Sequence, residues 1–270
     1  MTTLFLIAGI IVIVVFRYKG ELKEGYGEVV RSTGPIRSKV MPMPLVYREI
    51  LTKYFPYYNK LSISDKSRFE QKLCYIIYSK VFIPRNFDGV TDEMKVLIAA
   101  TAVQLTFGLN GVHLSHFRRI LIYPNDYYSS ITKNFHKGEV NPAFGMIVLS
   151  WHSFVLSYLK PNPDGVNLGI HEMAHALRLE NIIRNDEYQF FNEGLLEQLD
   201  AYGVKVCDIH DHEQVRFFRP YACANPHEFF AVAIENFFER PTELYKEMPG
   251  LYNVLCALLN QNPAIYATSA

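Results

Sequence analysis

The chain has 270 residues, of which 49% are hydrophobic and 14% aromatic. Such a composition is typical of a globular protein with a substantial core and excludes a disordered chain. The 27 basic and 27 acidic residues balance, which excludes an overall charge that would attract nucleic acid or an anionic surface. We therefore expect no direct nucleic-acid partner.

The N-terminal segment is apolar. Residues 1–16, MTTLFLIAGIIVIVVF, contain no charged side chain and would form a helix roughly 24 Å long. This is slightly shorter than the ~30 Å hydrocarbon core of a membrane, but the basic side chains that follow can reach the membrane interface and close the gap. The segment lacks the basic start and cleavage site of a signal peptide and the polar face of a soluble helix. We therefore expect residues 1–19 to form a single-pass transmembrane anchor. Basic residues follow it, so the positive-inside rule places the rest of the chain on the cytoplasmic side of the cell membrane.

Glycine, proline and mixed charges mark residues 20–44 as a linker, so the folded domain should occupy residues 45–270. Hydrophobic periodicity and capping residues predict helices before and after a few short strands, which indicates a mainly helical α+β domain with a small sheet. The expected elements are a helix starting at Ser64, an apolar helix from Thr91 to Gly108, strands at 119–123 and 145–149, a loop with one edge strand at 125–142, and further helices from about Val166.

The four cysteines are far apart and form no CxxC pair. They are Cys74, Cys207, Cys223 and Cys256. This pattern fits neither a disulfide framework nor a thiolate zinc site, and it predicts four free thiols in a reducing compartment.

Residues 167–177, NLGIHEMAHAL, contain an HExxH motif. His171 and His175 would project from one face of a helix, where both can reach one zinc ion. Glu172 lies between them and can act as the general base that deprotonates a metal-activated water. The motif predicts a zinc-dependent peptidase with one Zn²⁺ per chain.

A catalytic zinc site needs a third protein ligand. The metzincin extension is absent, because Asn181 stands where its third histidine would be. Glu193, in FFNEGLLE, is similar to the ligand of gluzincin aminopeptidases but lies one position short of their spacing, and it would suit an aminopeptidase. Glu228 lies on an apolar helix starting near Pro226, where a buried carboxylate needs a partner such as a metal. Both glutamates remain open from the residues alone.

Two further residues accompany Glu228. Tyr221 precedes it by seven positions and is close enough to lie over the same site. Glu235 lies two helical turns beyond Glu228 on the same face, where we expect it to support the site or the fold.

Several segments carry a family resemblance. They are TDEMKVLIAA at 91–100, ILIYP at 120–124, GMIVLSW at 145–151, NLGIHEMAH at 167–175 and YxxxxPxEFFAVxxExFF at 221–238. In them the chain resembles the family of Mlc titration factor A, glucose-phosphotransferase regulators grouped with zinc peptidases. The resemblance implies a gluzincin fold related to the anthrax lethal factor catalytic domain, with Glu228 as the third metal ligand and Tyr221 as transition-state donor. It also implies two functions, hydrolysis of a peptide or protein substrate and sequestration of a transcriptional regulator.

Overall fold

The computed structural model describes residues 43–129, 133–159, 164–183, 189–210 and 217–264. The expected anchor, residues 1–19, and almost all of the expected linker lie outside these ranges. Within them, no helix is both long and apolar enough to cross a membrane.

The described chain begins with helices α2 (Leu45–Tyr54), α3 (Pro56–Asn59), α4 (Ile63–Ser79) and α5 (Asp92–Thr106). Side-chain caps set the starts of α4 and α5. The Ser62 side chain accepts a hydrogen bond from the Asp65 amide, and the Thr91 side chain accepts one from the Met94 amide. Helix α5 is buried continuously from Val96 to Thr106, as its apolar sequence predicts, and it forms the centre of this half of the domain.

A four-stranded mixed sheet follows the order β1-β2-β6-β5. Strands β1 (Val81–Pro84), β2 (Arg119–Tyr123) and β6 (Met146–Ser150) are parallel, and β5 (Gly138–Asn141) is an antiparallel edge strand. Strands β2 and β6 lie where the sequence predicts them, the second shifted by one residue. Strand β1 was not predicted, because four residues ending in proline give no clear alternation.

The expectation of a loop with one edge strand at residues 125–142 is wrong in detail. Besides β5, this stretch contains β3 (Tyr127–Ser129) and β4 (Asn134–His136), which pair antiparallel in a separate two-stranded sheet. Strands of three residues are too short to show a reliable period in a sequence rich in aromatic and polar residues.

The second half is helical: α6 (Trp151–Leu159), α7 (Leu168–Ile183), α8 (Glu193–His210), the 3₁₀ turn η1 (Pro220–Cys223), α9 (Pro226–Glu239), α10 (Pro241–Glu247) and α11 (Pro249–Leu259). Helix α6, which follows β6 without a break, was not predicted. The described residues thus confirm a mainly helical α+β domain with a small mixed sheet.

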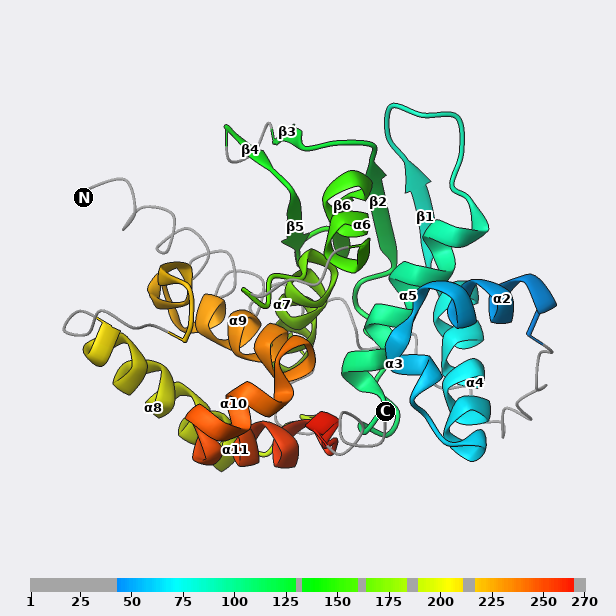
Figure 1. The fold of residues 1–270 in the computed structure, drawn as a ribbon. Coiled ribbons are helices and arrows are strands. Elements are labelled where there is room, and N and C mark those ends of the chain that lie inside the picture. Colours follow the sequence, from blue (N-terminus) through cyan, green and yellow to red (C-terminus); the bar gives the residue numbers. More distant parts are fainter. Residues whose placement is uncertain (1–42, 130–132, 160–163, 184–188, 211–216, 265–270) are drawn as a thin grey trace, which may run out of the picture. The chain divides into compact units, whose positions relative to one another are not determined.

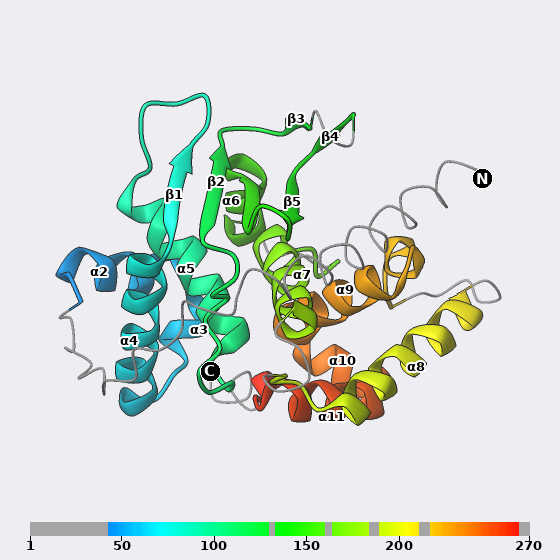
Figure 2. The same ribbon diagram turned by 180° about the vertical axis from the view of Figure 1, so that it is seen from behind.

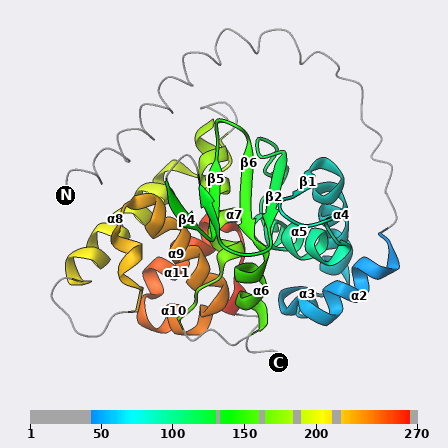
Figure 3. The same ribbon diagram turned by 90° about the horizontal axis from the view of Figure 1, so that it is seen from above.

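The two groups of helices lie at opposite edges of the sheet. Figure 1 shows α2 to α5 on the β1 side and α8 to α11 beyond β5, and Figure 2 shows the same order from behind. In Figure 3, seen from above, the four strands follow one another across the domain. Helix α7 packs against β5, β6 and α5 and makes an extensive contact with α9. The HExxH helix is therefore held between the sheet and the C-terminal helices.

The prediction of four free thiols is wrong for two of them. Cys207 on α8 and Cys223 in η1 form a disulfide, with their Cα atoms 5.5 Å apart, whereas Cys74 and Cys256 are free. The two cysteines are 16 residues apart and match no disulfide motif, so the sequence did not indicate this pairing. The pairing arises because α8 and η1 pack against each other.

Candidate metal centre

Asn167 starts the HExxH helix and ties it to α9. Its side-chain oxygen accepts a hydrogen bond from the Ile170 amide at 3.1 Å, and its side-chain amide donates to Glu239 on α9 at 2.8 Å. The Asn167 backbone amide donates to Glu235 at 2.8 Å. The first turn of α7 is therefore capped and fixed against α9 before the motif begins.

Helix α9 is capped so that Glu228 lies in its first turn. The side-chain oxygen of Asn225 accepts hydrogen bonds from the amides of His227 and Glu228, at 2.9 and 3.1 Å, and Pro226 occupies a position in the first turn that needs no amide donor. The following residues from Phe229 to Phe237 are buried. The apolar face of α9 thus packs in the core, which leaves Glu228 facing α7.

The two histidines and Glu228 converge on one point. The Nε2 atoms of His171 and His175 are 3.0 Å apart, and Oε2 of Glu228 lies 3.2 and 3.4 Å from them. Bonds of 2.0–2.1 Å in a tetrahedral zinc site require ligand atoms to be about 3.3 Å apart. Oε2 of Glu228 is buried and has no hydrogen-bond partner among the described residues. The three atoms therefore fit a metal ion, and among the described residues they form a group of metal-binding type.

The electrostatics of this cluster favour a cation. Burial alone would raise the pKa of Glu228, but its interactions with His171 and His175 outweigh burial and hold that pKa well below its usual range. Burial lowers the pKa of His171, yet Glu228 and Glu235 outweigh it and raise that pKa to about 10. Positive charge is thus stabilised where the ligand atoms meet, and a divalent ion would meet the same potential.

Glu172 lies beside this cluster and outside the ligand set. It is buried, and burial raises its pKa against the opposing effect of the two histidines. Strand β5 passes so close that a Cβ atom on Gly138 would lie 2.5 Å from Oε1 of Glu172. The carboxylate is therefore confined between α7 and β5, in the position and with the pKa direction that suit a general base.

Tyr221 approaches the cluster from η1. Its ring centroid lies 6.1 Å from that of His171, and half of the residue is exposed. Burial and the Glu228 carboxylate raise the pKa of its hydroxyl, so the hydroxyl keeps its proton and can donate a hydrogen bond. The Tyr221 side chain thus borders both the ligand cluster and solvent.

Behind His171 lies a buried ion pair. Oε1 of Glu235, a fully buried residue, lies 2.6 Å from Nδ1 of His171. Arg219 donates to both oxygens of Glu235, at 2.6 and 3.0 Å. This arrangement orients the imidazole so that Nε2 faces the other two ligand atoms. The sequence placed Glu235 on the correct face, but it offered no signal for Arg219 beyond its position next to the turn that carries Tyr221.

The alternative ligand lies elsewhere. Glu193 is exposed in the first turn of α8 and does not belong to the cluster. The spacing argument for an aminopeptidase, which depended on Glu193, therefore loses its structural basis.

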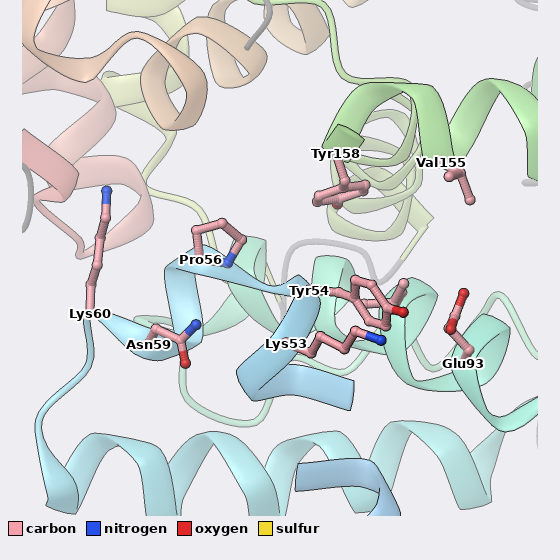
Figure 4. Close-up of a pocket in the computed structure, with 9 residues that line it drawn as sticks. Lys53, Tyr54, Pro56, Asn59, Lys60, Glu93, Val155 and Tyr158 are labelled. Carbon is pink, nitrogen blue, oxygen red and sulfur yellow. The ribbon is translucent and has the colours of Figure 1, made fainter. Parts of the chain in front are cut away.

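A separate cavity of about 590 Å³ lies between α2, α3, α5 and α6 (Figure 4). Its lining includes Lys53, Lys60, Glu93 and Tyr158. None of the cluster residues lines it, and its lysines would repel a cation. The candidate metal ligands lie on α7 and α9, apart from this cavity.

Comparison with known proteins agrees with this geometry. Residues 33–259 match the family model described as glucose-regulated metallo-peptidase M90. The chain is similar to the uncharacterized protein slr2042 of Synechocystis sp., with 29% identity over 240 residues that cover 79% of this chain and 83% of that protein. It is also similar to Mlc titration factor A of Yersinia pestis and of Yersinia pseudotuberculosis, with 24% identity over 228 residues, or 75% of this chain and 80% of each relative.

Proposed function

The chain belongs to the M90 family of glucose-regulated metallopeptidases, whose members hydrolyse peptide bonds, and from this premise we propose that it is a zinc peptidase with a His171–His175–Glu228 centre. The observation that carries the proposal is the convergence of the three ligand atoms within 3.0 to 3.4 Å of one another. Two histidines and a glutamate are a common ligand set of catalytic zinc.

When bound, zinc would polarise the scissile carbonyl and acidify the attacking water. Glu172 then accepts the proton of that water and passes it to the leaving amine, a role supported by its burial beside the ligands. Tyr221 donates a hydrogen bond to the oxyanion that develops on the carbonyl oxygen. Glu235 and Arg219 hold His171 in the orientation that the reaction needs.

The test of this mechanism is Glu172→Gln, which keeps the shape of the side chain and removes the base. Zinc content, measured by mass spectrometry, should stay near one ion per chain, while kcat on a peptide library should fall by about 10²–10⁴-fold. Glu197→Gln, on an exposed position of α8, is the matched control and should leave kcat unchanged. Parent-like cleavage by the zinc-loaded Glu172→Gln protein would contradict the assigned role.

The name of the Yersinia relatives, Mlc titration factor A, supports a second function, the binding of a transcriptional regulator. We propose that such a regulator binds this chain without being cleaved. The Glu172→Gln protein separates the two functions, because it should still capture the regulator if hydrolysis is secondary. Loss of capture would contradict binding that is independent of hydrolysis, and cleavage of the regulator by the parent protein would make it a substrate instead.

For the N-terminus we propose a membrane anchor at residues 1–19 with the catalytic domain on the cytoplasmic side, supported by the uncharged segment MTTLFLIAGIIVIVVF and the basic residues after it. The full chain should sediment with membranes, and a chain starting near Gly20 should stay in the supernatant. A full-length protein with an intact N-terminus that behaves as soluble would exclude the anchor.

A further inference from the structure

The short turn that carries Tyr221 is held at both ends. At its start, Arg219 accepts a hydrogen bond from the Ala222 amide at 3.0 Å and binds Glu235 through its guanidinium. At its end, Cys223 is bonded to Cys207 on α8. Tyr221 therefore lies between an ion pair that reaches His171 and a covalent link to a different helix.

The Tyr221 ring is only partly held by its surroundings, although η1 also packs against α9 and the hydroxyl interacts with Glu228. The turn has four residues and no side-chain cap at its start, and half of Tyr221 is exposed. Its ring lies beside Arg219, 5.8 Å from the guanidinium carbon, and 6.1 Å from the His171 ring. A 3₁₀ turn this short has weak hydrogen-bond geometry of its own, so its anchor points determine where the hydroxyl lies.

We propose that the Cys207–Cys223 disulfide is a redox-dependent tether that positions Tyr221 over the metal centre. The inference rests on the proposed function, because it concerns the oxyanion donor of that reaction. In the oxidised protein the tether holds the end of η1 against α8. Reduction takes two electrons and two protons from a dithiol, which becomes a disulfide itself, and leaves two cysteine thiols on the protein. The turn then keeps Arg219 and its packing against neighbouring helices but loses its covalent link.

The pair is accessible to a reductant. Cys207 and Cys223 are both partly exposed, whereas the free thiol of Cys74 is buried. Disulfides of proteins that face a reducing compartment are usually transient. A catalytic domain on the cytoplasmic side would therefore hold this pair in a variable redox state, and its activity would follow that state.

The first measurement counts thiols in the zinc-loaded full chain under denaturing conditions, with and without prior reduction by a phosphine. Two thiols should react before reduction and four after it. Four reactive thiols in the unreduced, air-equilibrated protein would overturn the proposal, because the tether would not exist.

The second measurement compares kinetics in the two redox states. Reduction should lower kcat by about tenfold, since small misplacements of a catalytic group cost one to two orders of magnitude, and should leave KM and zinc content nearly unchanged. The variant lacking Cys74 and Cys256 (both→Ala) should respond like the parent, and Cys207→Ser should resemble the reduced parent in both conditions. An equal kcat in both redox states of the parent would overturn the proposal.

Two further readouts separate positioning from general stabilisation and from the peptidase function itself. In Tyr221→Phe the reductant should have almost no further effect on kcat, because the group that the tether positions is gone. Hydrogen exchange of the Ala222 and Ala224 amides, which are bonded within the turn, should accelerate on reduction even if no peptide is cleaved. Unchanged exchange would refute the tether, whereas faster exchange in a protein without peptidase activity would refute only the proposed reaction.

Discussion

The buried carboxylate of Glu235 offers the sharpest test of how the metal centre is built. Its two oxygens accept hydrogen bonds from Arg219, at 2.6 and 3.0 Å, from the Asn167 amide at 2.8 Å and from His171 at 2.6 Å. In Glu235→Gln one of these oxygens becomes an NH₂ group. Donors face both positions, so either orientation of the amide places a donor against a donor.

Loss of an outer partner of a metal-binding histidine typically costs 10- to 100-fold in metal affinity, which equals about 1.4–2.7 kcal/mol. We expect Glu235→Gln to weaken zinc binding by this amount, measured by competition with a chromogenic chelator. Its apo form should also lose stability in thermal unfolding, because the Arg219 guanidinium keeps a poorer partner.

Glu239→Gln is the matched control. Glu239 lies one turn further along α9 and accepts a hydrogen bond from the Asn167 side chain at 2.8 Å, but no contact joins it to His171 in the described structure. It should change stability without changing zinc affinity. If Glu235→Gln binds zinc within twofold of the parent, or if both variants weaken zinc equally, Glu235 does not act through His171.

Three other predictions follow from single contacts. Gly138→Ala should lower kcat by tenfold or more with zinc retained, since its Cβ would lie 2.5 Å from Glu172; Gly89→Ala, where nothing lies within 4 Å, should not. Asn225→Ala should lower the free energy of unfolding in urea by about 1 kcal/mol, because α9 loses its cap; an unchanged midpoint would refute the cap. Burial lowers the pKa of Lys80 to about 8 from 10.5. Between pH 8 and 10.5 the unfolded chain therefore binds more protons than the folded protein. The free energy of unfolding of the parent should rise with pH in this range, by at most about 3 kcal/mol more than that of Lys80→Met. Parallel pH profiles of the two proteins would contradict this.

Local geometry made part of the site predictable. His171 and His175 must share a face once the segment is helical, and Glu172 must lie beside them, because four residues nearly complete one turn. Glu228 is more than fifty positions further on. It could be proposed only from the cost of burying a carboxylate on an apolar helix and from the family resemblance, because no local rule brings α9 against α7.

Long-range contacts account for what the sequence did not reveal. Strand β1 exists because β2 offers it a parallel partner, and Cys207 meets Cys223 because α8 packs against η1. Arg219 is one arginine among many in the sequence. Arg219 matters because its acceptor, Glu235, is fully buried. That burial results from the packing of α9, and the residues next to Arg219 in the sequence do not reveal it.

The formal charges explain why these groups tolerate being together. Three carboxylates, of Glu172, Glu228 and Glu235, lie at the centre with little or no exposure, and Arg219 supplies one compensating positive charge. Unpaired buried charges cost several kcal/mol each. A divalent cation held by neutral histidines would supply two positive charges and would replace the proton that His171, with its raised pKa, holds in the metal-free cluster. Asn167 and Asn225 cap α7 and α9, and Asn167 also joins the two helices through Glu239. These contacts involve no metal ligand atom, so they would hold the two helices together in the apo protein as well.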